Sequence, residues 1–149
     1  MINESVKLKG DLVITVLDKD GKVKERREEK NLIVSAGLTF ICSRMANATA
    51  TVMSHMAVGS STTAPQASDT GLGSALGTRE PLDSTVASAN TVTFVSSFEA
   101  GEGTGAVTEA GIFNAATSGT MLCRTTFPVV NKGANDTMAI TWVITLSAS

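Results

Sequence analysis

Alternation of apolar and polar residues is the dominant pattern in this chain, and it predicts strands. In residues 8–16 the apolar side chains fall on one parity and most polar ones on the other, which is typical of a strand with one buried face. The clearest case is residues 137–146, where Met138, Ile140 and Trp142 alternate with small or β-branched residues. Further strands are predicted at residues 53–59, 85–87, 91–98, 107–114 and 121–127.

A charged return segment follows the first predicted strand. The sequence DKDG at 18–21 predicts a tight turn, because its glycine tolerates positive φ. Residues 22–30, KVKERREEK, are almost all charged, so this strand is expected at an edge or in a protruding ribbon. We therefore expect a single domain, with residues 1–30 as an N-terminal β-hairpin arm and residues 31–149 as a β-rich body.

One segment changes from period two to helical spacing. Leu38, Ile41, Cys42 and Met45 lie three or four residues apart, and Ser35 before them is a good helix N-cap. A short amphipathic helix packed on a sheet is the expected structure.

Short connections in the C-terminal half indicate how its strands are joined. Residues 91–146 are expected to form a four-stranded antiparallel meander, because sequential strands with short loops usually pair. The predicted fold is mainly β: an antiparallel β-sandwich-like domain with one α-helix in the N-terminal half and a protruding N-terminal hairpin.

Composition narrows the classes of partner. Hydrophobic residues make up 42% of the 149, which suffices for a core, whereas aromatic residues make up only 4%. Base-stacking and sugar-binding sites rich in rings are therefore not expected. The net charge of -2 gives no general attraction to nucleic acid or to an anionic membrane. Cys42 and Cys123 lie in apolar surroundings and are expected to be buried free thiols of a reducing cytoplasm.

No motif in the chain predicts catalysis, a metal or a cofactor. The glycine-rich residues 101–105 lack the lysine of a phosphate-binding loop and join two predicted strands. His55 is the only histidine and has no neighbouring ligand residues. Calcium binding or acid–base chemistry would have to combine acidic residues whose spacing does not match a calcium loop. Those acidic residues are Asp69, Glu99, Glu102 and Glu109.

Glu109 is the exceptional acidic residue, since it lies in an otherwise apolar strand. An unpaired buried carboxylate is very costly, so a cationic partner is expected. Arg124, in the next predicted strand, is at a comparable distance from the connecting turn, and Arg79 is the second candidate. We predict a structural Glu109–Arg124 pair that fixes strand register more than it adds stability.

Four segments, taken in order, resemble a group of small virion proteins of tailed bacteriophages. They are residues 30–45, 53–80, 98–114 and 119–146, which contain the sequences KNLIV, MAVG, TEAGIFN and ITW. Together they cover nearly the whole chain except the N-terminal hairpin.

This resemblance implies a non-enzymatic structural part of a virion. The leading expectation is a capsid decoration or cement protein that stabilises the head shell, and the alternative is a tail, fibre or baseplate-associated adaptor. Implied partners are the major capsid protein or tail proteins, with no nucleic acid and no membrane. A homo-oligomer assembled in the host cytoplasm is also expected. A receptor or glycan binder is a third class, which the low aromatic content disfavours.

Two exposed features are candidates for contacts with neighbouring proteins. One is the charged part of the hairpin, and the other is the small-residue loop at 60–69. The candidate interface residues are Lys22, Lys24, Arg26, Arg27, Ser60, Thr62 and Pro65.

Overall fold

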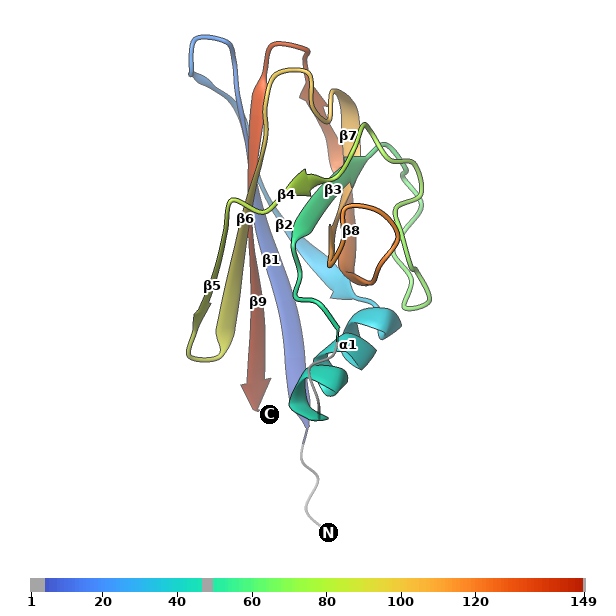
Figure 1. Cartoon of the computed structure of the whole chain (residues 1–149). Coiled ribbons are helices and arrows are strands. Elements are labelled where there is room, and N and C mark those ends of the chain that lie inside the picture. Colours follow the sequence, from blue (N-terminus) through green and yellow to red (C-terminus); the bar gives the residue numbers. More distant parts are fainter. Residues whose placement is uncertain (1–4, 47–49, 149) are drawn as a thin grey trace.

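A computed structural model describes residues 5–46 and 50–148, which form one curled antiparallel sheet and a single helix (Figure 1). The elements, in chain order, are β1 (Val6–Leu17), β2 (Val23–Ile33), α1 (Ser35–Ala46), β3 (His55–Gly59), β4 (Glu80–Pro81), β5 (Ser84–Ser88), β6 (Thr91–Phe98), β7 (Gly105–Phe113), β8 (Met121–Lys132) and β9 (Thr137–Ala148). No helix in the described part of the chain is long and apolar enough to cross a membrane. The element list confirms the predicted class, which is mainly β with one helix.

The strand order shows how the sheet encloses the core. The order is β4-β3-β7-β8-β2-β1-β9-β6-β5, so the strands form one sheet instead of the two stacked sheets of a sandwich. Within residues 5–46 and 50–148 the ladder between its two halves is short and consists of Leu32 and Ile33 of β2 paired with Arg124 and Cys123 of β8. The sheet bends at this narrow junction into a half-barrel, and its concave face holds the main apolar core (Figure 1).

The predicted C-terminal meander is wrong except for one pair of strands. β7 pairs with β8, but β6 pairs with β9 and β5, and β9 pairs with β1. The β6–β7 and β8–β9 connections cross from one half of the sheet to the other. Because β6 and β7 lie in different halves of the curled sheet, Phe94 and Phe98 of β6 share one core cluster with Val107 and Ile112 of β7.

The N-terminal hairpin is part of the body and not a separate arm. β1 is an inner strand that pairs with β9 over its whole length and with β2 on its other side. Its side chains Leu12, Ile14 and Val16 are buried in the core. The turn between β1 and β2 projects at the end of the half-barrel where the β6–β7 and β8–β9 connections also lie (Figure 1).

The helix forms where predicted, but its apolar face is not the one expected. Leu38 N donates to Val34 O at 3.0 Å, so Val34 is the N-cap and Ser35 is the first helical residue. α1 contacts the sheet closely through Gly37, where a Cβ would lie 2.1 Å from the backbone oxygen of Leu122. α1 lies at the end of the half-barrel (Figure 1), and part of its apolar surface is exposed. The larger exposed apolar residues of α1 are Leu38, Cys42 and Met45.

A buried polar contact fixes the inner strands relative to one another. Trp142 is fully buried, and its Nε1 donates to Asn31 Oδ1 at 3.1 Å across the intervening strand β1. The Asn31 side chain passes over Gly10, where a Cβ would lie only 1.4 Å from Oδ1. Glycine at this position therefore permits the contact between β2 and β9.

Candidate functional site

The structure contains the predicted pair of Glu109 and Arg124. Glu109 comes from β7 and is fully buried, and Arg124 comes from β8 and is almost fully buried. Arg124 Nη2 and Nε lie 3.0 and 3.1 Å from Glu109 Oε1. Charge-assisted contacts of this kind are shorter and stronger than neutral hydrogen bonds. The pairing of these two residues is therefore confirmed, while their effect on register stays a prediction.

The two residues meet diagonally. In the β7–β8 ladder Glu109 is opposite Thr126, and Arg124 is opposite Gly111. Diagonal neighbours two positions apart share a face and lie within reach of long side chains. A Cβ at Gly111 would lie 3.1 Å from Leu72 Cδ2, so glycine on this face leaves room for Leu72 to pack beside the pair.

Three backbone groups of the preceding loop complete the shell around the Glu109 carboxylate. The amides of Ser61 and Ser74 donate to Oε2 at 2.9 and 2.8 Å, and the amide of Gly73 donates to Oε1 at 2.8 Å. Gly59 is needed beside them, since a Cβ there would lie 2.5 Å from Oε2. The carboxylate thus replaces its lost hydration with donors from both ends of residues 60–76.

Asp69 closes the other side of the cluster. Arg124 Nη1 donates to Asp69 Oδ2 at 2.9 Å, and Arg124 Nη2 donates to the carbonyl of Thr63 at 3.0 Å. The same Asp69 oxygen accepts from the amide of Gln66 at 2.9 Å. We call Asp69, Glu109 and Arg124, with the loop groups they bond, the loop-anchoring cluster. It fastens residues 60–76 to the convex face of the sheet.

The anchored loop also covers a second, smaller apolar cluster. Leu72 packs there against Phe113 of β7, which explains why residues on both faces of β7 are buried. The buried members of this cluster are Val34, Ala57, Phe113 and Met121. The loop-anchoring cluster is thus continuous with packed apolar surface. The bonds of its charged groups go to one another and to the loop backbone, so they hold the loop in place.

Arg79, the alternative partner of Glu109, has a different role. Its guanidinium lies 3.6 Å from the centroid of the Phe113 ring, a cation–π contact. Its Nη1 donates to the carbonyls of Ala115 and Ser118 at 2.9 and 2.7 Å. Partial burial lowers the pKa of Arg79 by desolvation. Arg79 therefore holds the loop between β7 and β8.

The remaining acidic candidates do not gather around one point. Glu102 accepts from the amide of Glu99 at 2.8 Å, and Lys132 Nζ donates to the carbonyl of Glu99 at 2.9 Å. Asp69 is linked to Glu109 only through Arg124. In the described residues no three His, Cys, Asp or Glu side chains are arranged to hold a metal ion.

The histidine and the two cysteines are separated from this cluster. His55 is the half-buried first residue of β3, and its Nδ1 lies 2.8 Å from Oγ of the preceding Ser54. Both cysteines are free, as expected, but only Cys123 is buried, and burial raises the pKa of its thiol. Cys42 is exposed because its side of α1 faces away from the sheet.

Three of the four basic residues of the candidate interface, Lys24, Arg26 and Arg27, form ion pairs within the chain. Lys24 Nζ lies 2.6 Å from Asp136 Oδ2, and Arg26 pairs with Glu28 at 3.0 Å. Arg27 pairs with Glu25 and donates to the carbonyls of Pro128 and Val129 in β8. These contacts bridge β2 to a region of β8 where the ladder register shifts. Lys22, Ser60 and Thr62 are exposed, and Pro65 is half-buried.

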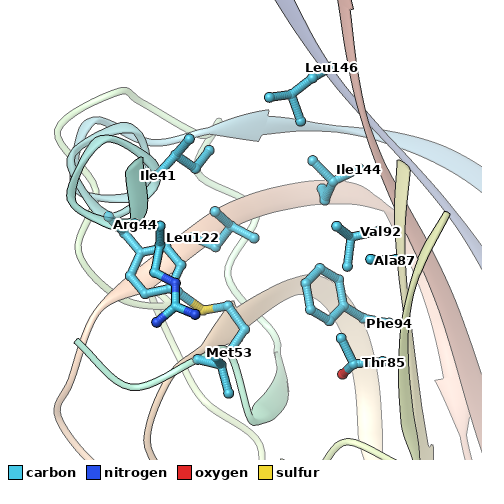
Figure 2. Close-up of a pocket in the computed structure, with 12 residues that line it drawn as sticks. Ile41, Arg44, Met53, Thr85, Ala87, Val92, Phe94, Leu122, Ile144 and Leu146 are labelled. Carbon is cyan, nitrogen blue, oxygen red and sulfur yellow. The ribbon is translucent and has the colours of Figure 1, made fainter. Parts of the chain in front are cut away.

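An apolar groove is the feature that sequence reasoning missed. It lies between α1 and the β5–β6–β9 side of the sheet and has a volume of about 340 Å³ (Figure 2). Ile41, Phe94 and Ile144 are among its walls, and Arg44 lies at its margin. The only sequence signal for it is the helical apolar spacing, which does not reveal that α1 covers the half-barrel end incompletely.

Comparison with known proteins gives no match, whether to a protein-family model, to a curated protein or to a solved structure.

Proposed function

We propose that this chain is a non-enzymatic structural component of a tailed-phage virion, acting as a capsid decoration or cement protein that stabilises the head shell. The observation that carries the structural role is the loop-anchoring cluster. Arg124 bonds to both carboxylates, and each of the three charged residues bonds to the loop backbone, which holds one surface loop in a fixed shape. The virion assignment is supported by the sequence resemblance described above.

A rigid loop is what a decoration role requires. A protein that docks on many equivalent sites binds more tightly when its contact surface is ordered beforehand, since ordering it on binding costs free energy. Ser60 and Thr62 lie in the anchored loop with exposed side chains. The anchored loop therefore offers a preformed contact surface for a neighbouring capsid protein.

The copy number on purified particles tests this proposal. Quantitative mass spectrometry against the major capsid protein is expected to give hundreds of copies, and a cryo-electron microscopy reconstruction should place them over the shell. Roughly a dozen copies or fewer, at a ring of low symmetry, would instead indicate the tail, fibre or baseplate-associated adaptor.

A reconstitution experiment tests the stabilising role separately. Particles that lack the protein should lose their genome at a lower temperature, and added purified protein should restore the wild-type temperature. Glu109→Gln, which loosens the anchored loop, should restore less than the matched variant Glu28→Gln at an exposed ion pair. Equal heat resistance of particles with and without the protein would count against a cement role.

A further inference from the structure

The free edges of the sheet differ in how they are protected against pairing with another strand. Exposed edges are usually short, charged, or interrupted by proline, because open backbone groups pair readily with other strands. β4, at one end of the sheet, has two residues, and one of them is Pro81. The part of β2 that extends beyond its short pairing with β8 is dominated by charged residues. Both of these edges carry the expected protection.

β5, at the other end of the sheet, lacks all of these protections. Its sequence is STVAS, without charge or proline, and all five residues are exposed. Among the described residues β5 pairs only with β6, so its second edge is open. The open edge thus lies on an uncharged strand of ordinary length.

The two faces of β5 have different surroundings. Thr85 and Ala87 line the apolar groove together with Val92 and Phe94 of β6 (Figure 2). Val86 points to the opposite face, because side chains alternate along a strand, and it is 57% exposed. The open edge therefore has the apolar groove on one face and the exposed Val86 side chain on the other.

We propose that β5 pairs antiparallel with β5 of a second copy of this chain, across a two-fold axis that passes through Val86. In this register Ser84 lies opposite Ser88, Thr85 lies opposite Ala87, and Val86 lies opposite its own counterpart. The strand is nearly symmetric about its centre, so no charges oppose each other and no large side chain meets a mismatch. Identical patches related by a two-fold axis are the commonest kind of homodimer contact.

Pairing also extends the apolar groove. A shared sheet keeps its two faces, so Thr85 and Ala87 of both copies lie on the same side and the two grooves meet at the new strand pair. Val52, which is 58% exposed, lies along the same groove. The second copy is favoured as the partner because one patch then supplies both the complementary strand and the complementary apolar surface.

This inference does not rest on the virion assignment. A decoration protein binds a shell whether or not its copies pair through β5, so each proposal can fail while the other stands.

Solution mass gives the first test. Multi-angle light scattering after size exclusion should show a dimer for the wild-type chain and a monomer for Val86→Lys, which places like charges opposite each other at the axis. Val23→Lys is the matched control, since Val23 is 65% exposed on β2 and lies outside the proposed contact. It should remain dimeric. A wild-type chain that stays monomeric, or a dimer that Val86→Lys leaves intact, overturns the proposal.

Cross-linking gives a second test that does not depend on disrupting the contact. Opposed residues in an antiparallel ladder have Cα atoms about 4.5–5.5 Å apart, within the range of a disulfide. In a Cys42→Ser background, Val86→Cys should form a covalent dimer on mild oxidation, whereas Val23→Cys should not. Equal cross-linking of the two variants would contradict the register, and circular dichroism verifies that each variant is folded.

Discussion

Glu109 and Arg124 form a buried ion pair although they are not directly opposed in the β7–β8 ladder. Glu109 is opposite Thr126 and Arg124 is opposite Gly111, so the two side chains meet across a diagonal. The amides of residues 61, 73 and 74 in the loop donate to the same Glu109 carboxylate. The pair therefore stabilises a strand-to-loop contact as well as a strand-to-strand contact.

Neutralising this carboxylate should be strongly destabilising. Glu109→Gln leaves Arg124 with the half-buried Asp69 as its remaining carboxylate partner and places an amide NH₂ among hydrogen-bond donors, which is expected to cost about 3–5 kcal/mol of unfolding free energy. Urea denaturation measures the loss. Glu28→Gln, which breaks an exposed pair with Arg26, should cost less than about 1 kcal/mol. A similar small effect at both positions would show that the buried pair has no special role. Limited proteolysis should also cut the loop at residues 60–76 faster in Glu109→Gln.

Gly10→Ala should separate the inner strands locally. The new Cβ would lie 1.4 Å from Asn31 Oδ1, so Asn31 must move away from Trp142. Loss of this buried hydrogen bond is expected to cost about 1–3 kcal/mol. Trp142 is the only tryptophan, and its fluorescence should therefore report the change directly. Gly71→Ala is the control, because a Cβ there meets nothing within 4 Å. An unchanged emission spectrum in Gly10→Ala would mean that the indole does not depend on Asn31.

The contact between Lys24 and Asp136 should make stability sensitive to acid. The hydrogen bond from Lys24, followed by that from the Gly133 amide, lowers the pKa of Asp136 below its ordinary value. A carboxyl with a lowered folded-state pKa contributes stability above its unfolded pKa of about 3.9, and this contribution is lost as the pH falls through the folded value. Asp136→Asn should thus lower stability at neutral pH and flatten its decline below about pH 4.

A double-mutant cycle separates this contact from general acid unfolding. In a Lys24→Met background, Asp136→Asn should cost less than it does in the wild-type chain, because the main cause of the lowered pKa is already absent. Urea midpoints at neutral and acid pH provide the comparison. Additive costs would show that the two groups are not coupled.

Ala89 should accept glycine with a gain in stability. It lies in the turn between β5 and β6 with φ of 52°, a left-handed conformation that is unfavourable for residues with a Cβ. Ala89→Gly is expected to stabilise the chain by up to about 1 kcal/mol after the larger entropy loss of glycine is counted. Thermal unfolding would detect this. Ala106→Gly, an exposed position in β7 without a positive φ, should instead lower the melting temperature. A lower melting temperature for Ala89→Gly would contradict the strain argument.

The sequence by itself determined the local elements and one long-range pair. Alternating apolar residues identify strands because the side-chain period of a strand is two, and they located β6 and β9 closely. The position of Glu109 in an apolar strand predicted a cationic partner, because an unpaired buried charge is very costly. Arg124 was the nearest cation along the predicted hairpin.

Beyond the hairpin pairs β1–β2 and β7–β8, the tertiary structure alone decided which strands became neighbours. Period-two patterns specify the buried face of a strand but not its pairing partner, so the crossing of β6 and β9 to one half of the sheet was not visible. The bonds of Ser61, Gly73 and Ser74 to Glu109 come from backbone amides, which every residue except proline carries. The groove depends on where α1 lies in space, and the open edge of β5 depends on its place as the last strand of the sheet. These features arise from the three-dimensional path of the chain, and a pattern of side chains does not encode them.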